Sequence, residues 1–271
     1  NPHEYRNYLY RGCFDYLYDK VGMYDTLRHV IGGGSATGIT GAWQSVDDIN
    51  TRMLYFLENH DEQRIASKFF AGNAEAGKPA LLVSALMRTN PMMIYFGQEL
   101  GEQGMYSEGF SGQDGRTTIF DYWTIDLIRR WRNNGKFDGS LLSKEETALQ
   151  TYYAKVLNLC NKEKAIREGA FFDIMYVNHG VGMNEHREYA FLRMSGKELI
   201  LVIANFSDKV SRSWVKIPAH AFEHLGIPVI DTERECKDLL TGKKEKKVLI
   251  PDGSLYIETP AYGGKVLKFK L

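Results

Sequence analysis

The feature that most constrains the fold of this chain is a change of pattern near Gly169. Before it, short apolar runs alternate with segments of helical length; after it, short strand-like runs follow one another, separated by turn residues. Alternating strands and helices are typical of a parallel α/β sheet, whereas short strands at regular spacing indicate an antiparallel sandwich. At 271 residues the chain is long enough for both. We therefore predict an α/β domain over 1–168 and a β-sandwich domain over 169–271.

The first part is expected to contain three parallel strands with helices between them. The apolar runs predict strands at Cys13–Asp19, Leu54–Asn59 and Pro91–Glu99, and the intervening segments predict helices at Asp47–Met53 and Glu75–Thr89. A further amphipathic helix is indicated by apolar residues at spacings of three and four, namely Leu149, Tyr152, Tyr153, Val156, Leu159 and Cys160. This helix is expected to pack against the sheet.

The second part reads as strands joined by tight turns. Two apolar runs flank the expected turn residues Ser195 and Gly196, and shorter runs follow between "PDG" and "YGG" turns. The lysine-rich run Lys243–Lys247 is expected as a solvated turn between strands.

Composition excludes several classes of function. The 34 basic and 34 acidic residues balance, so the chain lacks the positive charge with which proteins bind nucleic acids or anionic membranes. Cys13, Cys160 and Cys236 are far apart and odd in number, which argues against a disulfide framework and a zinc site. The longest apolar runs are too short to cross a bilayer. We expect a soluble protein, and the sequence does not distinguish a cytoplasmic from a secreted or periplasmic one.

Polar side chains are predicted where the three strands end. Asn59, His60 and Asp61 follow the second strand, Asp15 to Asp19 lie near the end of the first, and Gln98 and Glu99 follow the third. Carboxyl ends of parallel strands share one face, where α/β proteins place their active sites. The spacing alone equally allows Asp61 to be the N-cap of a following helix.

Two segments together make a resemblance specific. "FLENHDEQR" resembles the fourth conserved region of the α-amylase family of glycoside hydrolases, and "NPMMIYFGQELG" resembles the family's eighth barrel strand, in the right order and interval. The resemblance runs over nearly the whole chain. It implies the C-terminal portion of a (β/α)8 TIM barrel, about strands six to eight, followed by the family's C-terminal β-sandwich.

The resemblance also implies roles for four residues. Asp61 matches the acid that stabilises the transition state, and His60 matches its neighbour that donates to the same sugar ring. Asn59 and Arg64 are carried over as substrate-binding candidates, although Asn59 is expected chiefly to hold the loop and Arg64 to pair with a local acid. The implied substrate is an α-glucan: starch, glycogen or maltooligosaccharides.

The resemblance leaves parts of the family's machinery unaccounted for. Retaining hydrolysis needs a nucleophilic carboxylate and a separate acid/base roughly 5 Å apart, and nothing here resembles the strands that carry them. We expect them to precede Asn1, so the chain by itself is expected to be inactive. No cofactor or metal is expected here, since the family's calcium site belongs to a domain inserted earlier. The missing half or another chain would cover the open barrel edges.

Other interpretations stay open at this point. A transglycosylase or branching enzyme of the same family would carry the same motifs, and the chain could instead be a non-catalytic carbohydrate-binding or structural piece. Aromatic residues near the start could stack on sugars but are interpreted mainly as core: Tyr8, Tyr10, Tyr16, Tyr18 and Tyr24. The four tryptophans, Trp43, Trp123, Trp131 and Trp214, are expected in the core or at its rim.

Overall fold

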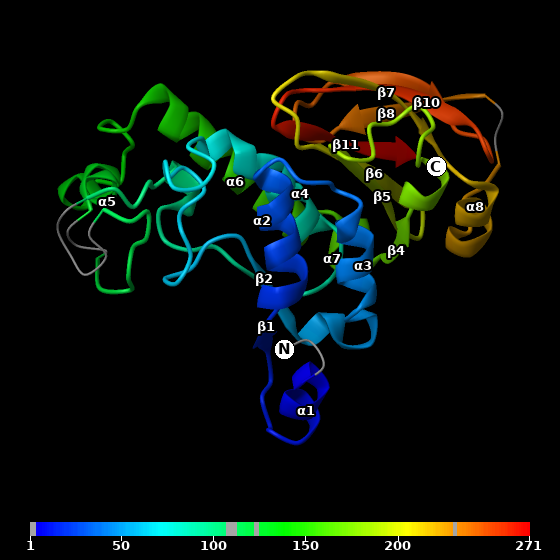
Figure 1. The fold of residues 1–271 in the computed structure, drawn as a ribbon. Coiled ribbons are helices and arrows are strands. Elements are labelled where there is room, and N and C mark those ends of the chain that lie inside the picture. The colour runs from blue at the N-terminus through cyan, green and yellow to red at the C-terminus, as the bar shows by residue number, and fades with distance from the viewer. Residues whose placement is uncertain (1–3, 107–112, 122–124, 230–231) are drawn as a thin grey trace.

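The structure, a computed structural model, describes residues 4–106, 113–121, 125–229 and 232–271. It forms an α/β part joined to a β domain (Figure 1). The α-helices are α1 (Tyr5–Tyr10), α2 (Asp25–Ile31), α3 (Gly38–Gln44), α4 (Lys78–Leu86), α5 (Asp126–Arg132), α6 (Lys144–Lys162), α7 (Lys164–Glu168) and α8 (Ala219–Leu225). The strands are β1 (Leu17–Tyr18), β2 (Met53–Phe56), β3 (Met92–Met93), β4 (Ala170–Asp173), β5 (Glu188–Ser195), β6 (Glu198–Asn205), β7 (Ser211–Lys216), β8 (Glu233–Asp238), β9 (Lys244–Val248), β10 (Ser254–Thr259) and β11 (Gly263–Lys270). Short helical turns include η2 (Lys20–Tyr24), η3 (Asp47–Arg52), η4 (Ala74–Gly77), η5 (Gln98–Leu100), η7 (Asn133–Gly135) and η8 (Met175–Val177).

The predicted parallel sheet is present, with the order β1-β2-β3. Leu17 pairs with Met53, and Tyr55 pairs with Met92, both in parallel register. The strands are shorter than predicted: β1 and β3 have two residues each. Strands are held by hydrogen bonds to their neighbours, and within the described residues β1 and β3 have a neighbour on one side only. Their outer edges are therefore open.

The predicted helices of this part are present with shifted boundaries. Asp47–Arg52 forms the 3-10 turn η3, and β2 already begins at Met53. The expected helix over Glu75–Thr89 begins as η4 and continues as α4, which has Pro79 in its first turn and is buried along nearly all its length. A helix buried on all sides belongs to the core, and α4 is the centre of this part.

The long predicted helix is α6, and its start is fixed by a capping box. The Ser143 hydroxyl accepts a hydrogen bond from the Glu146 amide, and the Glu146 carboxylate accepts one from the Ser143 amide. The predicted apolar face is confirmed: Leu149, Tyr153, Val156 and Leu159 are buried, with Tyr152 and Cys160 packed against them.

The β domain consists of two antiparallel sheets. The larger has six strands in the order β4-β5-β6-β11-β8-β9, and the smaller pairs β10 with β7. In the hairpin of β5 and β6, Ser195 pairs with Glu198, so the turn is Gly196 and Lys197 rather than the expected Ser195 and Gly196. Gly196 has φ 59°, a left-handed conformation that suits glycine in such a turn.

The lysine-rich run Lys243–Lys247 was expected to be a turn, and this prediction is wrong. Lys244–Val248 is the edge strand β9, paired with β8. Edge strands rich in lysine resist pairing with other chains.

The two parts share one core. A single cluster of buried apolar side chains contains residues of α4 and α6 as well as β5, β6 and β11. At Gly264 of β11, a Cβ atom would lie 2.6 Å from Leu82 Cδ1 of α4, so this glycine allows the helix to approach the sheet closely. The domain boundary at 168/169 stays a prediction, with β4 beginning at Ala170.

A buried arginine also holds the two parts together. The Arg193 guanidinium of β5 donates to the carbonyls of Leu86 and Met87 at the end of α4, and to those of Ile166 and Gly169 around the end of α7. Burial lowers the Arg193 pKa to about 10, so the side chain remains cationic at neutral pH. It is placed where two helix dipoles leave partial negative charge.

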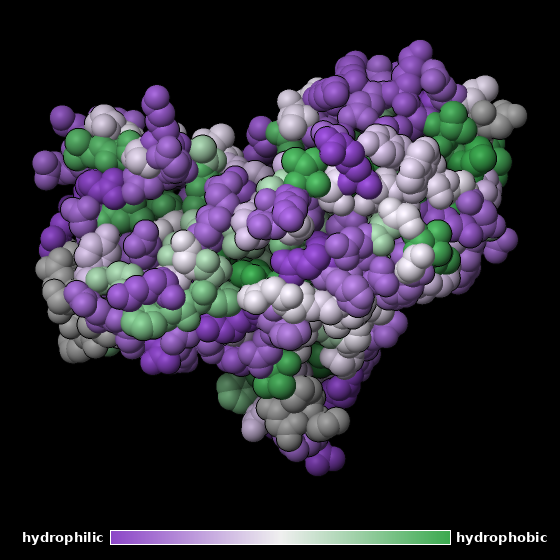
Figure 2. All heavy atoms as spheres, turned by 45° about the horizontal axis from the view of Figure 1, so that its top comes forward, coloured by the Kyte–Doolittle hydropathy of each residue, from purple (hydrophilic) through white to green (hydrophobic). Residues whose placement is uncertain are grey.

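The aromatic residues near the start are mostly not in the core. Tyr24 is buried, but Tyr8, Tyr10, Tyr16 and Tyr18 are exposed, so the core interpretation is wrong for these four. They lie on and after α1, on a projection whose surface includes apolar residues (Figure 2). Apolar surface of this kind is unusual unless another chain or segment covers it.

The tryptophans differ among themselves. Trp43 and Trp131 are half-buried against neighbouring side chains, as expected. Trp214 is 56% exposed and lies outside the core, contrary to the expectation. Trp123 lies outside the described residues.

Candidate active site

A buried ion pair holds the base of the loop after β2. The Glu58 carboxylate, 2% exposed, accepts from Arg64 Nη1 at 2.7 Å and from the Ile65 amide at 2.7 Å. The Arg64 guanidinium, fully buried, also donates to the Phe96 carbonyl and the Thr117 hydroxyl. Because a buried carboxylate is costly unless it is paired and hydrogen-bonded, Glu58 and Arg64 hold both ends of the loop together.

Asn59 shapes the turn between them. Its buried side-chain oxygen accepts hydrogen bonds from the Asp61 amide at 2.9 Å and the Glu62 amide at 3.1 Å. This is the local turn that asparagine forms with its own backbone. The structure thus places Asn59 under the loop and not on its surface.

His60 and Asp61 form the exposed tip of the loop. Their side chains are 49% and 71% exposed, and His60 Nε2 lies 3.5 Å from Asp61 Oδ2. The alternative that Asp61 caps a helix is wrong, because no helix begins within Glu62–Asn73 and the free amides are taken by Asn59. An imidazole and a carboxylate stand side by side, facing solvent.

The loop after β1 meets this loop through ion pairs. Lys20 Nζ lies 3.1 Å from Glu62 Oε1 and 2.7 Å from Asp25 Oδ1. Arg28 of α2 donates to the Gln63 side chain at 2.8 Å. The carboxyl ends of β1 and β2 are thereby joined at the same edge of the sheet.

Asp19, at the end of β1, is not part of this exposed rim. It is fully buried, and its carboxylate accepts from the Gly22 amide at 3.1 Å at the start of η2. Burial raises the pKa of Asp19 to about 6. Asp15 was expected on the rim too, but it precedes β1, and its carbonyl accepts from Arg52, which precedes β2. Asp15 therefore lies at the opposite end of the strands.

The loop after β3 lies beside the loop after β2 and is joined to it by hydrogen bonds to backbone carbonyls. The Arg64 amide donates to the Gly115 carbonyl at 2.7 Å, and the Tyr95 hydroxyl donates to the Thr117 carbonyl at 2.8 Å. Gln98 points into the core, where it donates to the Tyr153 hydroxyl of α6. Glu99 is half-buried, and burial raises its pKa. The three strand ends converge as expected, although several of the expected polar groups point inward.

Two residues of this arrangement were absent from the sequence prediction. The sequence analysis assigns no role to Glu58, or to Thr117, which lies 53 positions from Arg64. Glu58 could have been identified as an acid directly after an apolar strand, where a buried carboxylate needs a partner. The contact with Thr117 has no signal in the sequence.

The arrangement can bind hydroxyl groups but lacks a second reactive carboxylate in this loop. Glu58 is engaged by Arg64 and Ile65, and Glu62 pairs with Lys20. Asp61 is therefore the acid of this loop that is open to a ligand. Among the residues described, no group of three or more histidine, cysteine or acidic side chains is gathered where a metal ion could be held. No helix in the described part of the chain is long and apolar enough to cross a membrane.

Comparison with known proteins identifies the fold. No protein-family model matches the sequence, and a search of curated proteins found no match. Solved structures do match. AmyP in complex with maltose has 17% identity and a TM-score of 0.64, over 94% of this chain and 50% of that one. The maltogenic α-amylase AmyB from Thermotoga neapolitana has 17% identity and a TM-score of 0.64, over 96% and 52%. The cyclomaltodextrin glucanotransferase CldA has 16% identity and a TM-score of 0.57, over 91% and 43%.

These similarities confirm the predicted architecture. The chain has the fold of the C-terminal portion of an α-amylase-type barrel followed by the β domain, and it spans about half the length of the structures it matches. At such identities the likeness shows the fold, and function has to be argued from the site.

Proposed function

We propose that this chain is the C-terminal part of an α-glucan-active enzyme, a glycosidase of the amylase type. The observation that carries the proposal is the exposed His60 and Asp61 pair on a rigid loop at the carboxyl edge of the sheet. Hydrogen bonds from such groups to sugar hydroxyls strengthen as positive charge develops at the anomeric carbon. Solved structures of the same fold contain bound maltose, maltotriose or acarbose, which favours this class of ligand.

In this proposal each loop residue has a role. Asp61 stabilises the transition state and His60 donates to the same sugar ring. Asn59 and Arg64, carried over as substrate-binding candidates, act through the loop, since the Arg64 side chain has no exposed surface in this conformation. The nucleophile and the acid/base belong to residues outside this chain, and the mechanism is retaining. The open edges of β1 and β3 and the exposed Tyr8, Tyr10, Tyr16 and Tyr18 are covered by that remaining part or by another chain.

The test uses the parent enzyme with its whole barrel. Asp61→Asn is expected to lower kcat on starch by about 10²–10³-fold, the effect typical of removing one transition-state contact. His60→Ala is expected to have a smaller effect in the same direction. The matched control is Asp15→Asn, an exposed acid at the opposite end of the strands. An unchanged rate for Asp61→Asn would remove the transition-state role.

The isolated chain provides a second test. It is expected to release no reducing sugar from starch, since it lacks the two reacting carboxylates. Robust turnover by the 271 residues alone would contradict their proposed location elsewhere.

Transglycosylation is a second candidate function, because the cyclomaltodextrin glucanotransferase CldA has the same fold. Both reactions pass through the same glycosyl-enzyme intermediate. Chromatography of the products formed by the parent enzyme from maltoheptaose distinguishes them: shorter linear sugars indicate hydrolysis, and longer, branched or cyclic ones indicate transfer.

A further inference from the structure

The small sheet of the β domain exposes an outer face that the proposed reaction does not use. Its strands β7 and β10 alternate strictly between buried and outward-facing positions. Ser213, Val215, Leu255 and Ile257 face the core. The outward positions form three cross-strand pairs, Arg212 with Glu258, Trp214 with Tyr256, and Lys216 with Ser254. These six residues are called the outer face below. β7 and β10 lie across the large sheet from α4 (Figure 1).

Two large aromatic rings stand at the centre of the outer face. Trp214 is 56% exposed and Tyr256 is 42% exposed. Their ring centroids are 5.4 Å apart and the ring planes are inclined by 57°. Leaving an exposed tryptophan and tyrosine side by side forgoes the stabilisation of burying them. Exposed paired rings of this kind mark a binding surface.

The backbone under these rings is held firmly. The Trp214 amide donates to the Gly182 carbonyl at 2.8 Å, and a Cβ on Gly182 would lie 2.7 Å from the Trp214 carbonyl oxygen. Lys247 of β9 donates to the Tyr256 carbonyl at 2.8 Å. The rings are therefore presented by a fixed backbone, which limits the entropy lost when a ligand binds.

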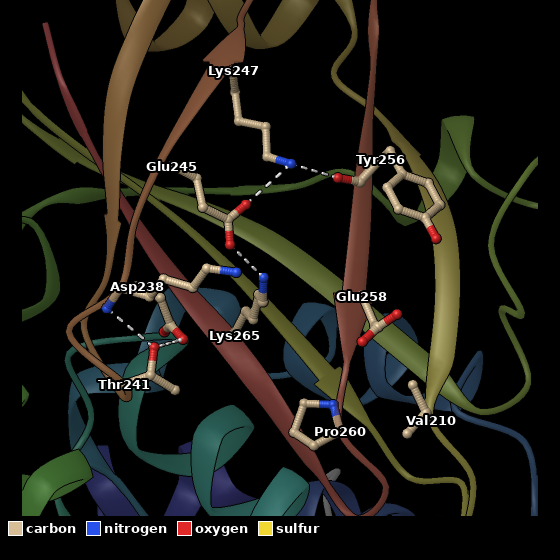
Figure 3. Close-up of a pocket in the computed structure, with 10 residues that line it drawn as sticks. Val210, Asp238, Thr241, Glu245, Lys247, Tyr256, Glu258, Pro260 and Lys265 are labelled. Carbon is tan, nitrogen blue, oxygen red and sulfur yellow. Dashed lines mark hydrogen bonds and ion pairs between the residues drawn. The ribbon is translucent and has the colours of Figure 1, made fainter.

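A cleft adjoins the outer face where β10 approaches the β8–β9 hairpin. Its volume is about 570 Å³, and Tyr256, Glu258, Glu245, Lys247 and Lys265 are among its lining residues. In Figure 3, Glu245, Lys247 and Lys265 come from one side of β10, and the side chains of Tyr256 and Glu258 lie on the other.

The charges around the rings and the cleft are balanced. Arg212 pairs with Glu258 at 2.8 Å. In the cleft, Glu245 accepts from Lys247 and Lys265 at 3.1 and 2.8 Å. The lining has three acids and three lysines: Asp238, Glu245, Glu258, Lys243, Lys247 and Lys265. Such a surface attracts neither an anion nor a cation strongly, and it offers fixed donors and acceptors to a neutral, polyhydroxylated ligand.

We propose that the outer face, with the adjoining cleft, is a second binding site for α-linked glucan chains. It is separate from the loop with His60 and Asp61 at the carboxyl ends of the parallel strands, which are called the strand ends below. Trp214 and Tyr256 stack on the apolar faces of successive glucose units, and the charged groups of the outer face and the cleft bond to their hydroxyls. Two rings inclined to each other fit a chain that bends between units, as α-1,4-linked glucose does, better than a flat ribbon. The choice of glucan as the ligand rests on the proposed function. The exposure and the geometry of the outer face are observed independently of that proposal.

Native electrophoresis of the 271-residue chain through gels containing amylopectin tests this. The wild type is expected to be retarded, and His60→Ala/Asp61→Asn is expected to lose only the share of the retardation that the loop after β2 contributes. Trp214→Ala/Tyr256→Ala is expected to bind about tenfold more weakly or worse, as for central aromatic contacts. Trp214→Phe/Tyr256→Phe keeps the rings and is expected to retain most of the retardation. Tyr176→Ala is the matched control, since Tyr176 is a comparably exposed aromatic residue, 54%, of the same domain. Unchanged thermal melting of Trp214→Ala/Tyr256→Ala shows that the fold is intact.

Four outcomes would overturn the proposal. Retardation unaffected by Trp214→Ala/Tyr256→Ala would place binding elsewhere, and loss only in His60→Ala/Asp61→Asn would place it at the strand ends. Equal retardation by hydroxyethylcellulose or polygalacturonate would remove the preference for α-linked neutral glucans. A wild type that amylopectin does not retard would remove the site, whereas the proposed function would still be judged by Asp61→Asn in the parent enzyme.

Discussion

The three-stranded sheet of the α/β part and the six-stranded sheet of the β domain differ in how far their strands are paired with partners from the chain itself. In the β domain, β5 and β6 pair over eight residues, and β6 pairs with β11 over another eight. In the α/β part, β1 and β3 have two residues each and, among the described residues, pair only with β2. A sheet of long paired strands with a buried face can stand alone, whereas three short parallel strands need further partners. The β domain is thus the stable platform, and the α/β part depends on it and on whatever completes its edges.

The largest effect is expected from cutting the link between the two parts. Arg193→Met should lower the free energy of unfolding by about 3–5 kcal/mol, because carbonyls at the ends of α4 and α7 lose a buried cation. Urea denaturation measures the loss. Arg167→Met, which removes an exposed arginine nearby, should change stability by less than about 0.5 kcal/mol. If both variants lose the same amount, Arg193 does not couple the parts.

The next largest effect should stay within the α/β part. Glu58→Gln leaves Arg64 as an uncompensated buried charge and should cost about 2–4 kcal/mol. Hydrogen exchange should become faster at the Ile65 amide, which donates a hydrogen bond to the Glu58 carboxylate. The exchange rates of the amides of β5 and β6 should not change. Faster exchange throughout the β domain would mean that the two parts unfold as one unit.

Asp19 should make the stability of the α/β part depend on pH. Its pKa in the folded state, about 6, lies above the ordinary value of 3.8 for an aspartate, so the folded state binds this proton more tightly than the unfolded state. The stabilising contribution is complete below about pH 4 and is lost as the pH rises through 6. Asp19→Asn should remove this slope and raise stability at pH 7 by about 3 kcal/mol. Urea titrations at pH 4.5, 6 and 7.5 measure it; an unchanged slope would contradict the assignment to Asp19.

The smallest effect is expected at the start of α6. Ser143→Ala removes one half of the capping box and should cost about 1 kcal/mol, measured as a lowered thermal midpoint. Ser143→Thr keeps the hydroxyl and should retain most of the stability. A loss as large as that of Arg193→Met would show that the helix start itself couples the two parts.

The sequence predicted the architecture better than the details of the site. Periodic patterns can be interpreted from the local sequence alone. In α6 the spacing of the apolar residues predicts which face of the helix is buried, namely the face with Leu149, Tyr153, Val156 and Leu159. The lengths of β1 and β3 depend on partners in the fold, which no local pattern reports. The exposure of Tyr8 and Trp214 was missed for the same reason, since an aromatic residue in an apolar run has the same signature whether or not something covers it.

Within the candidate site, the sequence located the loop at the strand end more clearly than the orientation of its side chains. The Asn59, His60 and Asp61 run at a strand end was identified from its position. The inward orientation of Asn59 follows from the hydrogen bonds that its side-chain oxygen accepts from the Asp61 and Glu62 amides, and these bonds form only in the folded loop. Gln98 was expected at the rim, but its contact with Tyr153 comes from a helix 55 positions away.

The buried Glu58 and Arg64 pair has a consequence for how this loop can change over time. Because the base of the loop is held by the buried side chains of Glu58, Asn59 and Arg64, substitution of the exposed His60 and Asp61 is expected to cost little stability. Substitutions at the two exposed positions can therefore accumulate without unfolding the protein. Side chains that recognise a different ligand can arise there at little cost in stability. The positions beneath have no such freedom. Selection for a different ligand would be expected to alter the tip of this loop long before it alters its base.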